Sequence, residues 1–223
     1  TLSSSSAASD VYKRQAVIFD FGGTLVRDKL DEQGYRQRLL DYIHGLGYSV
    51  NEHSLRNAIE GMLARLVKAH KRNRELRFED LYSSVLLKLG VNPSEETLNH
   101  VYELYKKSFS FEIVQGAEGI LQNLCGRYKL AVVSNAMSEF PRFALTNSGL
   151  IKFFQVVVLS RDLGIRKPNP KIFRYALKKL NVKPEEAIHV GDSIKHDVVG
   201  AKNAGIKVVW IKIEGEEVAE EPD

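Results

Sequence analysis

Apolar and polar positions follow two different patterns along this chain, and the change between them predicts two kinds of structure. Residues 16–19 form a short apolar run that ends at Asp20, just before two glycines, which is typical of a buried strand that runs into a turn. The long stretch that follows has helical periodicity and no strand pattern. Its candidate helices are residues 33–46, 55–70, 78–89 and 94–109.

Beyond Gly116, short apolar runs alternate with helical segments. The predicted strands are residues 130–134, 156–159, 188–190 and 208–211, and the predicted helices are residues 117–125, 139–147, 170–180 and 194–204. Strands that alternate with helices in this way indicate a parallel sheet covered on both faces. We therefore predict an α/β fold, a doubly wound parallel sheet formed by residues 16–26 and 113–213. An all-helical domain at residues 27–112 interrupts it.

The two ends of the chain carry neither pattern. Residues 1–15 are rich in serine and alanine, and we expect them to be a disordered or non-native leader. Residues 214–223 hold six acidic side chains in ten positions, so we expect a solvated acidic tail.

Composition and charge exclude several classes of protein. With 43% hydrophobic residues the chain can bury a sizeable core, but no apolar run approaches the roughly 20 residues that span a membrane. The net charge of +4 is too small to indicate nucleic-acid binding. The basic stretch at residues 65–77 has no interleaved aromatic residues, which favours a solvated helix face. We therefore expect neither a membrane nor a nucleic acid as a partner, and we expect the protein to be a monomer or a homodimer.

The only cysteine, Cys125, bears on the cellular location. One cysteine cannot form an internal disulfide, which favours a reducing, cytoplasmic compartment. Its helical spacing from Leu121 predicts that the thiol is buried in the core.

Candidate chemistry lies at the carboxyl ends of the predicted strands, where open parallel sheets bind their ligands. Asp20 follows the first strand and Asp192 follows the strand at 188–190, while Asp197 lies one turn into the next helix. An all-oxygen cluster of this kind suits Mg²⁺ better than zinc. A bound cation would also explain how three carboxylates tolerate one another.

A second group of residues provides what a phosphate group needs, namely hydroxyl or amide donors and one positive charge. Its members are Thr24, Ser134, Asn135 and Lys167. Asn169 is a good N-cap and Pro170 a good first helical residue, so a helix is expected to begin immediately after Lys167 and to hold this lysine near the site.

Four segments of the chain resemble the motifs of a known family. They are Val17-Ile18-Phe19-Asp20-Phe21-Gly22-Gly23-Thr24-Leu25, Val132-Val133-Ser134-Asn135, Lys167-Pro168, and Gly191-Asp192-Ser193-Ile194-Lys195-His196-Asp197. In this order they resemble the haloacid dehalogenase superfamily of phosphohydrolases, over nearly all of residues 16–211. Each segment alone is a weak signal. Four in the right order, each near a predicted strand end or helix start, are a strong one.

The resemblance implies a fold, a reaction and roles for particular residues. It implies a Rossmann-like core with a mobile helical cap, and a magnesium-dependent phosphatase that acts on a small phosphorylated metabolite. Asp20 would be the nucleophile and a metal ligand, Asp192 a metal ligand, and Asp197 a support for the metal site. The phosphoryl group would be held by Thr24, Ser134 and Lys167.

Gly22 departs from the family pattern. Most phosphatases of the family have there a second aspartate that moves protons, whereas a glycine can offer only its carbonyl to the metal. Losing a general acid and base typically costs about 10²- to 10⁴-fold in rate. Three hypotheses remain: a phosphatase without that group, a phosphonate or haloacid hydrolase, and a phosphate-binding regulatory protein with little turnover. Phosphonate cleavage would need a lysine that forms a Schiff base, for which Lys68 is an unsupported candidate.

Overall fold

The computed structural model describes residues 14–212, and this part of the chain divides into two compact units. One unit runs up to Arg27 and resumes at Ile113, and the other comprises Asp28–Glu112. The predicted leader and acidic tail fall almost entirely outside the described residues. Gln15, assigned above to the leader, accepts a hydrogen bond from the Lys129 backbone N–H and therefore extends the sheet of the first unit.

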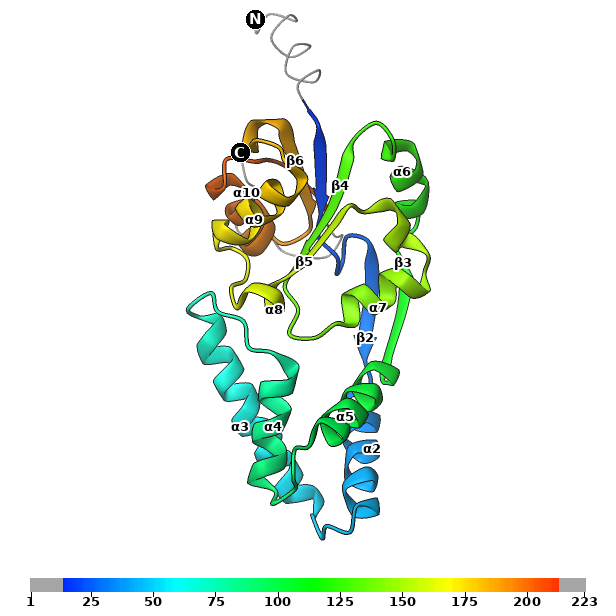
Figure 1. Ribbon diagram of the computed structural model, residues 1–223, viewed down its shortest axis with the longest axis vertical. Helices are drawn as coiled ribbons and strands as arrows, with labels where there is room; N and C mark the ends of the chain where they lie inside the picture. The colour runs from blue at the N-terminus through cyan, green and yellow to red at the C-terminus, as the bar shows by residue number, and fades with distance from the viewer. Residues whose placement is uncertain (1–13, 213–223) are drawn as a thin grey trace, which may run out of the picture. The chain divides into compact units, whose positions relative to one another are not determined.

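The first unit is built on a parallel sheet of five strands in the order β5-β4-β1-β6-β7 (Figure 1). The strands are β1 (Ala16–Phe19), β4 (Lys129–Ser134), β5 (Val156–Leu159), β6 (Ala187–Gly191) and β7 (Lys207–Trp210). All four strand pairings are parallel. The predicted parallel α/β fold is therefore confirmed, and it follows from short, continuous apolar runs that are buried on both faces.

Helices cover both faces of this sheet (Figure 1). Ile18 of β1 packs in a cluster with Phe173 of α9 (Pro170–Leu180) and Ala201 of α10 (Val199–Asn203). On the opposite face the Phe19 ring meets Phe154, with centroids 6.3 Å apart. That face also carries α6 (Ala117–Leu124) and α7 (Phe140–Asn147).

Three details of the first unit differ from the sequence prediction. Cys125 is exposed, because α6 ends at Leu124 and the chain turns there. The predicted helix at 194–204 consists of a π-helical turn, η3 (Ile194–Val198), followed by α10. Short segments not predicted from the sequence, α8 (Ser160–Leu163), η1 (Leu150–Phe153) and η2 (Pro184–Glu186), complete the connections.

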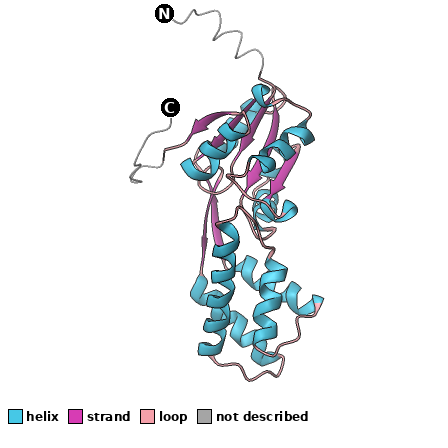
Figure 2. Cartoon of the chain, turned by 90° about the vertical axis from the view of Figure 1, so that its left-hand side faces the viewer, coloured by secondary structure: helices cyan, strands magenta, loops and turns pink. Residues whose placement is uncertain are grey.

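The second unit is a helical bundle of α2 (Glu32–Gly45), α3 (Glu52–His70), α4 (Phe78–Lys88) and α5 (Glu95–Lys107) (Figure 2). Side chains at three of the helix starts cap free backbone N–H groups: Asp31, Asn51 and Ser94 accept from the third residue beyond them. Aromatic rings fill the centre of the bundle, where Tyr35 contacts Tyr82 and Tyr105 edge-on.

The second unit is not all-helical, contrary to the sequence prediction. Two strands, β2 (Val26–Leu30) and β3 (Phe109–Ile113), pair with each other at its boundary with the first unit. In β2 only Val26 is buried, so the charged residues after it give no alternating pattern. In β3 exposed and half-buried positions do alternate, but this strand directly follows the helix predicted at residues 94–109, whose pattern masks it.

Candidate active site

Asp20 lies where β1 ends, between β4 and β6. Its backbone N–H donates to the Val190 carbonyl at 2.8 Å, which continues the β1–β6 pairing one residue past the strand. Because all the strands are parallel, the segments after β4 and β6 leave the sheet at the same edge as Asp20. Asn135 and Asp192 are the first residues of these two segments.

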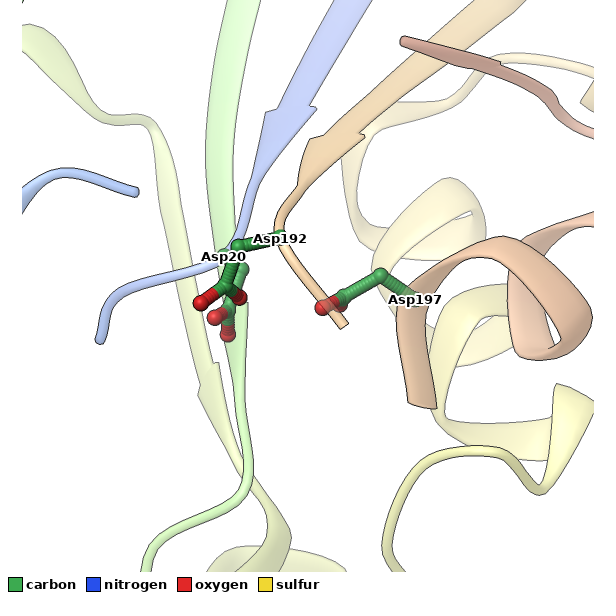
Figure 3. Close-up of side chains that lie close together, drawn as sticks. All are labelled: Asp20, Asp192 and Asp197. Carbon is green, nitrogen blue, oxygen red and sulfur yellow. The ribbon is translucent and has the colours of Figure 1, made fainter. Parts of the chain in front are cut away.

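Three carboxylates meet at this edge (Figure 3). Asp20, Asp192 and Asp197 each offer one oxygen atom, and these atoms all lie within 4.8 Å of one another. Asp20 and Asp192 project side by side from the ends of their strands, and Asp197 reaches toward them from η3 (Figure 3). The structure thus brings together the three acidic residues that the sequence analysis selected.

Lys167 joins two of these carboxylates. Its Nζ lies 2.5 Å from Asp20 Oδ1 and 2.6 Å from Asp197 Oδ1, and its side chain is only 2% exposed. Asn169 caps α9 by accepting from the Lys171 N–H, and Pro170 is the first residue of that helix, so the predicted helix start is confirmed. The lysine is therefore held beside the carboxylates by an ordered segment.

The pKa values of these groups reflect burial and shared charge. Desolvation raises the pKa of Asp20 to about 6, against the opposing attraction of Lys167. Burial also acts on Asp197, but the Lys167 ammonium and the His189 hydrogen bond outweigh it and hold the pKa of Asp197 below its usual range. The pKa of Lys167 is raised despite its burial, because both carboxylates favour its charged form. A bound cation would favour ionisation of all three acids.

The predicted phosphate-binding residues differ in what their side chains contact. Thr24 is buried, and its hydroxyl has no hydrogen-bond partner among residues 14–212, so it is available to a ligand. Ser134 is buried at the end of β4. The Asn135 amide is engaged with the main chain of Lys167, donating to its carbonyl at 3.1 Å and accepting from its N–H at 2.8 Å.

Two glycines allow the carboxylates to approach the backbone this closely. A Cβ on Gly23, whose φ is +72°, would lie 2.1 Å from Asp192 Oδ2. A Cβ on Gly191 would lie 2.4 Å from Asp197 Cγ. No side chain fits at either position without moving an aspartate. The donor set is oxygen-only and densely anionic, which is the chemistry that Mg²⁺ prefers, so the residues present fit this metal.

His189 is a site residue that sequence reasoning missed. The apolar run around it is typical of a packed strand, and the ring is fully buried in β6. Its Nε2, however, lies 2.8 Å from Asp197 Oδ1. The signal that could have found it is the spacing of eight residues between a strand histidine and the helical aspartate of the same motif.

Together, the parallel α/β sheet and the carboxylate–lysine cluster at its carboxyl edge have the arrangement of an enzyme active site on an α/β core. Residues 17–211 match the family model described as haloacid dehalogenase-like hydrolase. The chain belongs to this family, and the resemblance drawn from the four motifs is confirmed.

Among characterised relatives, two proteins named glyceraldehyde 3-phosphate phosphatase cover most of the chain. The one from Methanopyrus kandleri is 29% identical over 89% of this chain and 84% of its own length. The one from Pyrococcus furiosus is 30% identical over 89% of this chain and 80% of its own length. These relatives are hydrolases of the same family, which supports an enzymatic role for the chain.

Solved structures agree on the fold. A phosphatase of the family from Thermococcus onnurineus is 27% identical and superposes with a TM-score of 0.62, covering 94% of this chain and 91% of its own. A 2-haloacid dehalogenase from Pseudomonas syringae superposes with a TM-score of 0.70 over 93% of this chain and 90% of its own. At 24% identity the second likeness concerns the fold alone. Within residues 14–212, no helix combines the length and apolar character needed to cross a membrane.

Proposed function

We propose that this chain is a magnesium-dependent phosphatase that hydrolyses a small phosphorylated metabolite by way of a phosphoryl group on Asp20. One observation carries the proposal: Asp20 lies 2.5 Å from Lys167 Nζ, with oxygens of Asp192 and Asp197 within 4.8 Å. A buried carboxylate beside a fixed cation, at the ligand-binding edge of a parallel sheet, suits nucleophilic attack on phosphorus. The phosphatase relatives at about 30% identity support the same reaction class.

In the proposed first step, a carboxylate oxygen of Asp20 bonds to phosphorus while the ester P–O bond breaks, and the leaving oxygen takes up a proton from solvent, because Gly22 has none to give. In the second step, water attacks phosphorus and loses a proton to solvent, the bond between Asp20 and phosphorus breaks, inorganic phosphate leaves and the Asp20 carboxylate is restored. Lys167 would neutralise charge on the phosphoryl oxygens, and the unpartnered Thr24 hydroxyl would donate to one of them. Ser134 is the third candidate donor.

The metal would be held by Asp20 and Asp192, with Asp197 in support and the Gly22 carbonyl as a further candidate ligand. When bound, Mg²⁺ would offset the negative charge of the phosphoryl oxygens beside the carboxylates. Glyceraldehyde 3-phosphate is the first substrate to test, because the match to the two relatives named for it covers at least 80% of each relative's length. The role of residues 27–112 as a cap that selects the leaving group stays a prediction, as do a cytoplasmic location and a monomeric or homodimeric state.

The proposal is tested with a panel of metabolite phosphates, with and without Mg²⁺, beside Asp20→Asn. We expect hydrolysis of at least one sugar phosphate that requires the metal and is lost in the variant. Binding of Mg²⁺ and phosphate without turnover across the panel would instead support the regulatory alternative, which Gly22 favours. Halide release from a 2-haloacid without metal, or borohydride trapping of a phosphonoaldehyde, would support the other hydrolases.

Gly22 offers a sharper version of this test. It is not among the glycines with positive φ, so its backbone conformation is open to other residues. Since Gly22 cannot protonate a leaving group, we expect alkyl phosphates to react more slowly than aryl phosphates, and Gly22→Asp to narrow that gap. Gly22→Ala is the matched control, because it adds a Cβ without a proton donor. Equal wild-type rates for both leaving groups would argue against the missing acid.

A further inference from the structure

His189 is a polar residue in an otherwise apolar environment. It lies in β6, an inner strand of the sheet, and none of its surface is exposed. Its ring packs edge-on against Phe173 of α9, with centroids 4.9 Å apart. Burying an imidazole without a hydrogen bond is costly, and an apolar side chain could fill this space. We therefore expect the ring to have a polar partner.

The polar partner is the carboxylate of Asp197. Asp197 Oδ1 accepts from His189 Nε2 at 2.8 Å and from Lys167 Nζ at 2.6 Å. Asp197 Oδ2 accepts from the Ser193 backbone N–H at 3.1 Å. Three donors from three segments therefore orient this carboxylate, and His189 is the one that comes from the sheet.

The carboxylate beside Nε2 indicates where the ring carries a proton. Nε2 lies 2.8 Å from Asp197 Oδ1, and a carboxylate oxygen accepts hydrogen bonds. Two facing lone pairs would repel at this distance, so we assign a proton to Nε2, which makes His189 a donor to Asp197. Nδ1 of His189 is buried and has no hydrogen-bond partner within residues 14–212.

We propose that His189 is a positioning residue of the active site. Its Nε2–H holds the Asp197 carboxylate in the orientation that also binds Lys167 Nζ, and Lys167 in turn lies against Asp20. His189 itself touches neither the nucleophile nor Lys167 by any hydrogen bond described for it. It acts through Asp197. The expected effect on catalysis rests on the proposed function, whereas the hydrogen bond between His189 and Asp197 does not depend on it.

The main experiment compares two substitutions. His189→Gln places an amide donor where Nε2 stood, whereas His189→Leu fills the space and removes the donor. We expect His189→Leu to lower kcat by about 10- to 100-fold and to weaken Mg²⁺ binding, measured by calorimetry without substrate, by a similar factor. Losses of this size are usual when a hydrogen bond that supports a metal site is removed. His189→Gln should recover most of both, with KM little changed. His53→Leu, at an exposed histidine of α3, is the control.

Two outcomes would overturn the proposal. One is a folded His189→Leu protein with wild-type kcat and Mg²⁺ affinity, and the other is a folded His189→Gln protein as impaired as His189→Leu. A purely structural role would lower the melting temperature of both variants without changing kcat or metal affinity per folded molecule. If the wild type binds Mg²⁺ but hydrolyses nothing, the proposed function fails and the calorimetry still decides the role of His189.

A measurement on the metal-free protein needs neither activity nor a stable variant. In the ¹⁵N spectrum of histidine-labelled wild-type protein, the His189 signal should show a proton on Nε2. Its Nε2–H signal should move in Asp197→Asn and stay in Glu185→Gln, which removes an exposed charge elsewhere in the first unit. A ring without a proton on Nε2 would contradict the assignment and the proposal with it.

Discussion

Asn135 and Lys167 are joined by a reciprocal pair of hydrogen bonds. The Asn135 side-chain amide donates to the Lys167 carbonyl at 3.1 Å and accepts from the Lys167 N–H at 2.8 Å. This amide therefore imitates a strand partner for the lysine main chain. Because Lys167 Nζ continues to Asp20 and Asp197, Asn135 fixes the root of the side chain that neutralises charge in the site.

We predict that Asn135→Ala weakens both folding and catalysis. The Lys167 N–H loses its acceptor, which should lower the free energy of unfolding by about 1–3 kcal/mol. A displaced Lys167 should lower kcat by up to about 10²-fold, as small misplacements of catalytic groups do. Urea unfolding and steady-state kinetics measure the two effects. Asn123→Ala, at an exposed position of α6, is the control and should change neither. Wild-type kcat in Asn135→Ala would show that Lys167 needs no such support.

The crowding of Asp20, Asp192 and Asp197 predicts that the site costs stability when no metal is bound. Like charges a few ångströms apart repel, and their oxygens lie within 4.8 Å of one another. In EDTA, Asp192→Asn should therefore raise the free energy of unfolding by about 1–2 kcal/mol, a common gain when a functional site is neutralised. Glu185→Gln, which removes one exposed carboxylate, should leave it unchanged.

Adding Mg²⁺ should reverse the order of stability of the wild type and Asp192→Asn. The wild type should gain stability with metal concentration, because the ion binds the folded state, whereas Asp192→Asn should gain much less. Thermal melts with and without Mg²⁺ make the comparison. Equal gains in both proteins would mean that Asp192 is not a ligand.

The positions of the acidic residues could be predicted because they depend on simple patterns. Asp20 and Asp192 each follow an apolar run, and parallel strands bring the ends of such runs to one edge. The contacts of Asn135 and His189 could not be predicted in the same way. Asn135 bonds to main-chain atoms 32 residues away, and His189 looks like any other buried strand residue until its neighbour Asp197 is placed.

The boundary of the second unit illustrates a different limit. Strands β2 and β3 stabilise each other by pairing across about eighty intervening residues, whereas periodicity describes only neighbours. Cys125 was wrongly predicted to be buried for a related reason: the helical spacing is real, but the helix ends one residue earlier. Local patterns thus predicted the elements well and their ends and long-range partners poorly.

Gly191 lies too close to Asp197 to accept a Cβ atom without displacing that side chain. A Cβ at this position would lie 2.4 Å from Asp197 Cγ and 2.8 Å from its Oδ2. Gly191→Ala should therefore displace the Asp197 carboxylate from Lys167 and His189, lowering the free energy of unfolding by about 1–3 kcal/mol, as overpacking does. It should also lower kcat by at least about 10-fold, since Asp197 orients Lys167.

Gly119 provides the matched control for that substitution. It lies inside α6, and a Cβ there would meet nothing within 4 Å. Gly119→Ala should leave kcat unchanged and stabilise the protein by up to about 1 kcal/mol, because alanine favours the helix. Similar losses of activity in both alanine variants would show that the Gly191 effect is not local to Asp197.

The buried tyrosines of the second unit predict that the free energy of unfolding falls at alkaline pH. Burial raises the pKa of Tyr82 to about 12 from an ordinary value of 10, and it also raises the pKa values of Tyr35 and Tyr105. Between pH 10 and 12 the unfolded chain therefore loses a proton from Tyr82 that the folded chain keeps. The stability that this group contributes is complete below pH 10 and is lost as pH rises through 12, by about 2–3 kcal/mol.

Replacing Tyr82 with phenylalanine should remove its share of this dependence. Urea unfolding of Tyr82→Phe, measured from about pH 9 to about 12, should show a shallower fall in the free energy of unfolding, because the phenylalanine ring has no proton to lose. This range contains the window set by the pKa shift. The slope should not vanish, since Tyr35 and Tyr105 still titrate on unfolding. Tyr175→Phe is the control, because the Tyr175 ring on α9 is 38% exposed and its replacement should leave the slope unchanged. Identical slopes for wild type and Tyr82→Phe would mean that the Tyr82 hydroxyl is not desolvated in the folded unit.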